Sequence, residues 1–395
     1  MAVWILCCLG LVLIGFLLAQ GCINQLFVPK LRPGGASNEQ PLVSILIPAR
    51  NEQDRIGPCL RSLIAQTYPA TELILLDDQS EDGTLAIAAA CGLRPEPTER
   101  FRWYRGVPLP EGWTGKAWAC HQLSQIAQGK YLLFTDADTQ HHPAAVAAAM
   151  DAAVRYRADL LTAWPRQDAS TWAEKAFIPL MFVGACTYLP HWLLAWAQAS
   201  PSLARLLGSK GLRGFGSAIG QFLLFRREAY FECGGHSAVR SHLVEDVALG
   251  RLVAAETIRG RRLISCDGTD MVRCRMYSSI GELWEGFTKN LWPLFENDHF
   301  GFWLQLLCQL LFFLLPFVIL PFDRSGWVFT FVLAILSFRA LLAWRFHNGL
   351  WTVLLHPVGC VLALIIALNS YFRARVGSVS WKGRRYAVDP RAIAR

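Results

Sequence analysis

The central segment of the chain reads Tyr131-Leu132-Leu133-Phe134-Thr135-Asp136-Ala137-Asp138-Thr139. An apolar run that stops on two carboxylates predicts a buried strand that delivers acids to its carboxyl end. Because residues i and i+2 of an extended segment project to one side, we expect Asp136 and Asp138 to share one cation. Carboxylate oxygens suit Mg²⁺ or Mn²⁺. The alternative is a solvated turn after a strand, since this pair of acids also recurs by chance.

The composition is typical of a membrane-attached protein. Of the 395 residues, 53% are hydrophobic and 15 are tryptophan, and the mean hydropathy is +0.29. Residues 2–19 carry no charge and are long enough to cross a bilayer, whereas Lys30 and Arg32 follow them. Residues 1–22 are therefore predicted to form a transmembrane anchor with the N-terminus outside. A cleaved signal peptide is the competing interpretation, but no basic residue precedes the apolar run.

The spacing of the cysteines and the net charge indicate which metal sites, disulfides and binding partners can be expected. The 12 cysteines include no C-x-x-C pair, so the sequence indicates neither a zinc site nor a disulfide framework. The net charge of +8 would suit nucleic acid, yet much of the basic excess flanks apolar segments or lies in the C-terminal tail. The lipid bilayer is therefore the expected partner, and no nucleic acid is expected.

An α/β domain is predicted to begin after a polar linker at residues 23–41. Residues 43–47 and 73–76 are typical of buried strands, and helical patterns follow them at 52–66 and 83–91. Strands that are this continuously apolar predict a parallel sheet covered by helices on both faces. Ligands of such sheets bind beyond the carboxyl ends of the strands.

Polar clusters stand at three of these strand ends. They are Ala49–Glu52, Asp77–Thr84 and Asp136–Asp138. Taken singly, Asp82-Gly83 is an ordinary turn and Ser80 an ordinary helix cap. Taken together, the three clusters are expected to converge on one crevice.

A glycine-rich loop, Leu109–Lys116, precedes a helix predicted at residues 117–128. A helix N-terminus with a nearby lysine is a suitable site for a diphosphate, which makes Lys116 a candidate binding residue. The loop lacks the pattern G-x-x-x-x-G-K-[ST], so ATP hydrolysis has no support.

Residues 176–197 are apolar for long enough to cross a membrane, but Pro179 and Pro190 interrupt them. If Asp136 and Asp246 serve one site, the chain between them must cross the membrane an even number of times. This segment is therefore interpreted as interfacial or re-entrant.

Two patterns precede the C-terminal half. The glycines of Gly214–Gly220 do not have the spacing of a dinucleotide fingerprint, and a flexible loop before a strand at residues 221–226 is expected instead. Glu245 and Asp246 then open a helical pattern. They are either an acidic first turn, favourable to the helix dipole, or a general base with its neighbour.

Three apolar stretches follow, at residues 302–320, 326–344 and 350–369. Three crossings would leave the basic tail at 373–395 outside, whereas the positive-inside rule favours a cytosolic tail. We therefore expect two full crossings within a transmembrane region at 296–372. The remaining stretch, the one that carries His356-Pro357, would be re-entrant or lie on the surface.

These motifs resemble those of the inverting family 2 glycosyltransferases. The residues that carry the resemblance occur in that family's order: Val43–Glu52, Asp77–Thr84, Asp136–Asp138 and Glu245-Asp246. The resemblance implies a GT-A fold for a catalytic domain at residues 42–295. The membrane segments, the Gly112–Lys116 loop and the tail residues Trp381–Tyr386 are similar to the lipid-modifying subgroup, which includes carotenoid and ceramide glycosyltransferases.

The resemblance also implies a role for each matching residue. Glu52, Asp77 and Asp78 would hold a uridine, Asp136 and Asp138 would hold a divalent cation on the diphosphate, and Asp246 would be the base, supported by Glu245. Further candidates are Pro48, Asn51 and Lys116 for the donor, and Gln221, His236, Arg273 and Arg275 for the vicinity of the acceptor or diphosphate. The family's Q/R-x-x-R-W motif is not intact here, because Arg273-Cys274-Arg275-Met276-Tyr277 stands near its expected position.

The expected function is transfer of a single sugar from a nucleotide-diphosphate sugar to a hydroxyl of a membrane lipid. The donor is expected to be a UDP-linked hexose. A carotenoid-like acceptor is preferred over a ceramide, hopanoid or diacylglycerol one. A polysaccharide synthase is the enzymatic alternative, which the altered motif puts in doubt. A membrane scaffold with a degenerate nucleotide-binding fold would have lost at least one acid cluster, and none is lost.

The charge pattern around the first span predicts that the catalytic domain faces the cytosol. A Ser37→Cys variant should therefore stay unlabelled by a membrane-impermeant thiol reagent in intact cells and become labelled once the cells are permeabilised. The wild-type chain serves as the control for its own cysteines. Labelling of the variant in intact cells would contradict the orientation.

Overall fold

The computed structural model describes residues 2–32, 40–96, 98–323, 325–377 and 379–386. Positions 33–39 of the predicted linker and 387–395 of the predicted tail lie outside this range. The chain divides into two compact units. We call them the sheet unit, Phe27–Arg166 with His191–Arg275, and the helical unit, Met1–Leu26 with Gln167–Pro190 and Met276–Arg395.

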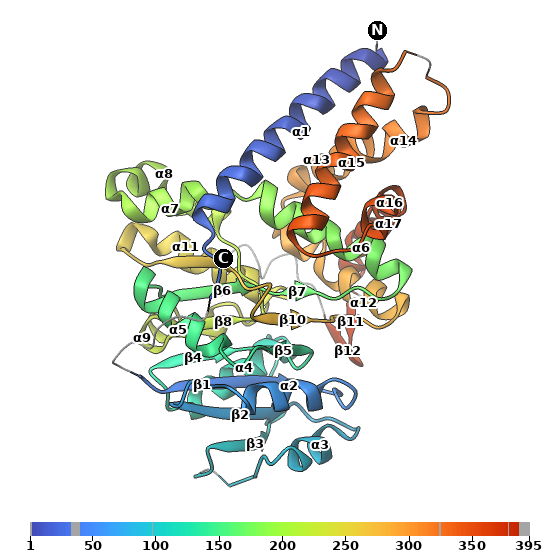
Figure 1. The fold of residues 1–395 in the computed structure, drawn as a ribbon. Coiled ribbons are helices and arrows are strands. Elements are labelled where there is room, and N and C mark those ends of the chain that lie inside the picture. The colour runs from blue at the N-terminus through green and yellow to red at the C-terminus, as the bar shows by residue number, and fades with distance from the viewer. Residues whose placement is uncertain (1, 33–39, 97, 324, 378, 387–395) are drawn as a thin grey trace. The chain divides into compact units, whose positions relative to one another are not determined.

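A seven-stranded sheet with the order β3-β2-β1-β4-β8-β6-β9 forms the middle of the sheet unit (Figure 1). Its strands are β1 (Val43–Ala49), β2 (Thr71–Asp77), β3 (Phe101–Arg105), β4 (Tyr131–Phe134), β6 (Leu160–Trp164), β8 (Leu223–Arg226) and β9 (Leu263–Asp267). Strand β1 is parallel to both β2 and β4, as predicted. The prediction of a parallel sheet is wrong at β8, which is antiparallel to β4 and β6. Leu223 at the start of β8 pairs with Phe134 at the end of β4, so the chain enters β8 from the carboxyl edge of the parallel strands.

Helices cover both faces of this sheet. They are α2 (Ile56–Ile64), α3 (Thr84–Ala90), α4 (Gly115–Ile126), α5 (Ala145–Tyr156), α7 (His191–Ala199), α8 (Pro201–Phe215), α9 (Arg227–Glu232), α10 (Gly235–Ala238), α11 (Glu245–Ala255) and the 3₁₀ turn η2 (Glu256–Arg259). Alternate residues of β1 enter opposite cores, because Ile45 and Ile47 pack with α2 and α5 while Leu46 packs with α4 and α11. The continuous apolar run of this strand is thus explained by burial on both sides.

The acids Asp136 and Asp138 lie in a turn, so their predicted extended conformation is wrong. The turn joins β4 to β5 (Thr139–His141), which pairs with β10 (Val272–Cys274) in a second, smaller sheet. Because the chain must leave the main sheet after Phe134 to reach that partner, the strand cannot continue through the acids. The Thr139 hydroxyl closes the turn by donating to the carbonyl of Asp136 at 2.7 Å.

The loop predicted at 214–220 is present at residues 216–220, but it is buried and packed, so its predicted flexibility is wrong. Gly214 and Phe215 end α8, and residues 216–220 are buried. A Cβ on Gly216 would lie 2.6 Å from the carbonyl oxygen of Gly250, and a Cβ on Gly250 would lie 2.7 Å from the backbone nitrogen of Ala218. Small residues are required here because the segment packs directly on the backbone of α11, which carries the acids Glu245 and Asp246.

The helical unit consists of α1 (Ala2–Phe27), α6 (Trp172–Val183), the π turn η1 (Gly184–Tyr188), α12 (Ile280–Asn290), η3 (Pro293–Phe295), α13 (His299–Cys308), the π turn η4 (Gln309–Leu314), α14 (Leu315–Ile319), α15 (Trp327–Arg345), α16 (Trp351–Leu354), α17 (His356–Arg375), β11 (Val379–Trp381) and β12 (Arg384–Tyr386). Strand β7 (Arg166–Gln167) stands at the boundary of the two units. Five segments of the described chain are long and apolar enough to cross a membrane: Val3–Phe27, Trp172–Ala199, His299–Ile319, Trp327–Arg345 and His356–Arg375. The protein is therefore membrane-associated.

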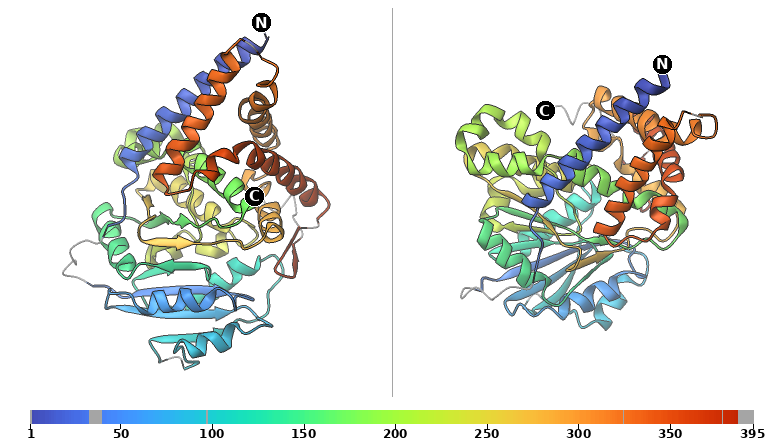
Figure 2. Two further views of the ribbon diagram at one scale, coloured as in Figure 1. Left: turned by 45° about the vertical axis from the view of Figure 1, so that its right-hand side comes forward. Right: turned by 45° about the horizontal axis from the view of Figure 1, so that its top comes forward.

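Within the helical unit, α1 and α15 run side by side (Figure 2). The contact is close because Gly10 leaves no Cβ where the ring of Phe331 packs. The buried guanidinium of Arg339 in α15 donates to the carbonyls of Pro179 and Thr352, at 3.2 Å each. Helix α17, dark red, is inclined to the pair in the left view of Figure 2. The predicted re-entrant or surface position of the segment with His356 remains a prediction.

Candidate functional site

The loops after β1 and β2 are joined by hydrogen bonds at the carboxyl edge of the sheet. The Asn51 side-chain oxygen accepts from the Glu81 N–H at 2.9 Å, and the Glu52 N–H donates to the Thr84 hydroxyl at 2.8 Å. The φ of Asn51 is +52°, a left-handed conformation that asparagine tolerates better than most residues. Asn51 therefore helps to hold the loops after β1 and β2 together.

Asp77 is the last residue of β2 and Asp78 follows it, as the sequence predicts, and both are buried. Asp77 Oδ1 accepts a hydrogen bond from the Ser80 N–H at 3.2 Å. Asp77 Oδ2 lies 4.0 Å from Nε of the exposed Arg105 and accepts no hydrogen bond from the described residues. Leaving a buried acceptor unpaired is costly, so this oxygen is suited to receive an N–H from a ligand.

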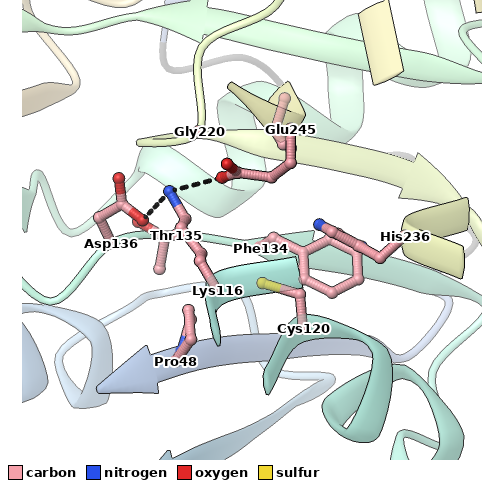
Figure 3. Close-up of a pocket in the computed structure, with 10 residues that line it drawn as sticks. Pro48, Lys116, Cys120, Phe134, Thr135, Asp136, Gly220, His236 and Glu245 are labelled. Atoms are coloured by element: carbon pink, nitrogen blue, oxygen red, sulfur yellow. Dashed lines mark ion pairs between the residues drawn. The ribbon is translucent and has the colours of Figure 1, made fainter. Parts of the chain in front are cut away.

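Lys116 joins three elements that are distant in the sequence (Figure 3). Its Nζ lies 2.7 Å from Asp136 Oδ1, after β4, and 3.0 Å from Glu245 Oε1, at the start of α11. Burial alone would lower the pKa of Lys116, but the carboxylates of Asp136 and Glu245 raise it well above its ordinary value. The ammonium group therefore remains charged, and it holds Asp136 and Glu245 together.

Asp246 lies beside this ion pair and is held by backbone donors. Its Oδ2 accepts the Gly220 N–H at 2.7 Å, and its Oδ1 accepts the Val247 N–H at 2.8 Å. Burial raises the pKa of Asp246 to about 6, with a further contribution from the charge of Glu245. A carboxyl group in this range can accept a proton near neutral pH, which an ordinary aspartate does poorly.

Asp138 is the second acid of the turn, and its surroundings suit a cation. Burial, followed by the nearby charges of Asp136 and Glu52, raises the pKa of Asp138 to about 7. Asp138 Oδ1 is buried and accepts no hydrogen bond from the described residues. No three ligand-type side chains form a ready metal site in the part of the chain that the structure describes. Two carboxylates without a third protein ligand fit Mg²⁺, which is commonly completed by substrate phosphates and water.

A small pocket lies among these groups. It is lined by Pro48, Lys116, Cys120, Phe134, Thr135, Asp136, Gly220, Leu223, His236 and Glu245. The His236 ring is buried, and its Nδ1 lies 2.9 Å from the Tyr230 hydroxyl. Burial lowers the pKa of His236 to about 3, so this imidazole is neutral at physiological pH.

The remaining predicted residues, Gln221, Arg273 and Arg275, lie in or next to β10. Gln221 is buried and its amide donates to the Cys274 thiol at 2.9 Å. Arg273 and Arg275 flank Cys274 in the sequence and are exposed. Strand β10 pairs with β5, so Cys274 stands opposite Thr139, directly after the acidic turn.

Sequence reasoning missed Gly220 and Cys274 as parts of the site. A Cβ on Gly220 would lie 2.7 Å from Lys116 Nζ and 3.2 Å from Asp246 Oδ2. The signal in the sequence was the cluster of glycines at 214–220, which indicates close backbone approach as well as flexibility. No sequence pattern marks Cys274 as part of the site, because its position depends on the pairing of two short strands, β5 and β10.

We predict that Gly220→Ala reduces activity much more than stability. The two atoms that the new methyl group meets are the ends of flexible side chains, so the fold can accommodate it, but Lys116 and Asp246 must move. Positioning errors of about 1 Å can cost roughly 100-fold in rate. Gly214→Ala is the matched control, because a Cβ there has nothing within 4 Å. Turnover and thermal unfolding of both variants test this, and unchanged turnover of Gly220→Ala would refute it.

The chain is similar to known glycosyltransferases in sequence and in fold. Residues 44–233 match the model of the family "Glycosyl transferase family 2". The chain is 28% identical over 260 residues to a 4,4'-diaponeurosporenoate glycosyltransferase of Staphylococcus aureus strain MRSA252, and 27% identical over 261 residues to the protein of that name in strain USA300. Each match covers 63% of this chain and 60% of the relative.

The fold is shared with a solved structure of a mannosyltransferase from Pyrobaculum calidifontis in complex with GDP-Man and Mn²⁺. The TM-score is 0.51 at 14% identity, and the alignment covers 93% of this chain and 98% of that one. The predicted GT-A fold with apolar helices at both ends of the chain is thereby confirmed. Residues 44–233 thus carry a domain that matches the family "Glycosyl transferase family 2".

Proposed function

We propose that this protein is an inverting glycosyltransferase that moves one sugar from a nucleotide-diphosphate sugar to a hydroxyl of a membrane lipid. The observation that carries the proposal is the cluster of Lys116, Asp136, Glu245 and Asp246 at the carboxyl edge of the sheet. The names of the curated relatives support a carotenoid-like acceptor. Five candidate membrane spans support an acceptor that is dissolved in the bilayer.

The donor is proposed to be a UDP-linked hexose bound along the ends of β1, β2 and β4. Glu52, Asp77 and Asp78 would hold the nucleoside, with Asp77 Oδ2 as an acceptor for an N–H of the base. A divalent cation held by Asp136 and Asp138 would neutralise charge on the diphosphate leaving group. The Lys116 ammonium adds a fixed positive charge at the same place.

Asp246 is proposed to be the general base. It would take the proton of the acceptor hydroxyl as the oxygen attacks the anomeric carbon from the face opposite the diphosphate, which inverts the configuration. The N–H groups of Gly220 and Val247 fix the carboxylate in place. Glu245 would act indirectly, because it binds Lys116 and contributes to the raised pKa of Asp246.

The acceptor is proposed to reach Asp246 from the bilayer. Residues 176–197 would lie along the membrane surface beside the acceptor path, with the catalytic domain in the cytosol. This arrangement would let a lipid present its hydroxyl without leaving the membrane. The thiol-labelling experiment with Ser37→Cys tests the orientation on which it depends.

We predict that Asp138→Asn abolishes cation-dependent binding of the nucleotide sugar while the fold is retained. The substitution keeps the shape of the side chain but removes the charge that a cation requires. Calorimetric titration of UDP with and without Mn²⁺, together with thermal unfolding, measures both effects. Asp151→Asn, a carboxylate on α5, is the control. Full transferase activity of Asp138→Asn in excess chelator would rule out the metal assignment.

We predict that Asp246→Asn lowers turnover by about 10²–10⁴-fold, the usual contribution of a general base, and spares donor affinity. Glu245→Gln should lower turnover less, because it leaves the base in place. Transfer of labelled sugar to lipid and nucleotide-sugar affinity should be measured for both variants. Wild-type transfer by Asp246→Asn, or selective loss of turnover in Glu245→Gln, would show that the assignment is wrong.

The dependence of activity on pH should also differ between the wild type and Glu245→Gln. Because the base must be deprotonated, the activity of the wild type should fall as the pH decreases through about 6. Glu245→Gln should shift this acid limb to lower pH, since it removes a charge that raises the pKa of Asp246. If the acid limb of Glu245→Gln stayed at the wild-type pH, Glu245 would have no effect on the pKa of Asp246, and the proposed coupling of the two carboxylates would be wrong.

A further inference from the structure

Helices α7 and α8 form a helical hairpin whose charges are all of one sign. Residues 191–215 contain Arg205, Lys210 and Arg213 and no aspartate or glutamate. Elsewhere in the sheet unit, Arg226 and Arg261 are both paired with the acid Asp159. A segment of 25 residues with cations alone is favoured next to an anionic surface.

The hairpin has one face in the protein core and one face exposed. Leu194, Ala197, Ala204 and Leu212 are buried against the sheet unit. On the exposed side, Trp196 is 53% accessible and Leu206 is 83% accessible. Large apolar side chains beside Arg205 and Lys210 are the composition of a helix that lies in a membrane interface.

Two links tie this hairpin to the membrane. The ring of Trp196 packs edge-on against Phe27, with the ring centroids 6.2 Å apart. Phe27 is the last residue of the candidate span Val3–Phe27, so it lies where that span reaches the membrane surface. Helix α7 is also the last part of the candidate span Trp172–Ala199, and α8 follows it directly in the chain. The contact and the chain connection therefore hold α7 at the level of the headgroups.

We propose that the α7–α8 hairpin lies on the membrane surface and binds anionic phospholipid headgroups. Trp196 and Leu206 enter the headgroup region, and Arg205 and Lys210 contact lipid phosphates. Tryptophan is enriched at this level of a bilayer, and basic side chains are attracted to its anionic lipids. This function is separate from sugar transfer, since it concerns how the sheet unit is held against its lipid surface.

The proposal can be tested with the full-length protein in nanodiscs that contain phosphatidylglycerol. A photoreactive residue at Leu206 should crosslink to lipid on illumination, and mass spectrometry would detect the lipid adduct. The matched control is the same residue at Val154, an aliphatic position of α5 that is 49% exposed. No adduct at 206, an equal yield at 154, or an adduct to a second protein copy would overturn the proposal.

The role of charge is tested by a double reversal, Arg205→Glu with Lys210→Glu. This variant should lose most of the adduct at position 206, and high salt should have the same effect on the parent protein. Arg94→Glu with Arg155→Glu makes the same change of charge on exposed positions outside the hairpin and should leave the adduct unchanged. Equal crosslinking in discs without anionic lipid would also contradict the proposal. Because these experiments measure lipid contact, their results do not depend on transferase activity.

Discussion

The ion pairs of Lys116 with Asp136 and Glu245 determine how the site is assembled. Each partner comes from a different element, namely the start of α4, the turn after β4 and the start of α11. A partly buried ammonium without these carboxylates would be unfavourable, and the two carboxylates without it would repel each other. The pairs therefore make the position of each element depend on the other two. Loss of Lys116 would affect the acids as much as the diphosphate that we propose it binds.

Close backbone packing makes this convergence possible. The segment 216–220 lies on α11 because Gly216 and Gly250 present no side chains at their contact. Gly220 then brings its N–H to Asp246, and its missing Cβ leaves space for the lysine. Carboxylates at the start of a helix are also stabilised by the helix dipole. One run of small residues thus sets the position, the hydrogen bonding and the surroundings of the proposed base.

The sequence predicted the parts of this site that depend on local pattern. The strands at 43–47 and 73–76, the acids at their ends and the helix after Lys116 were recognisable from periodicity and composition. The antiparallel strand β8, the turn at Asp136–Asp138 and the burial of 216–220 were not, because each depends on a partner distant in the sequence. Strand direction follows from where the chain re-enters the sheet, and the turn follows from pairing of β5 with β10. Glycine spacing alone does not distinguish an open loop from a segment packed on a helix backbone.

Burial has opposite effects on the pKa values of the two candidate bases of the site, His236 and Asp246. It lowers the pKa of His236 to about 3, because the imidazolium is disfavoured in an apolar environment beside Lys116. It raises the pKa of Asp246 to about 6, because the carboxylate is disfavoured by the same desolvation and by Glu245. A group accepts a proton more readily as its pKa rises, so the carboxylate is the stronger base by a wide margin. In the proposed reaction the environment therefore selects Asp246 and leaves His236 as a neutral wall of the pocket, held by the Tyr230 hydroxyl.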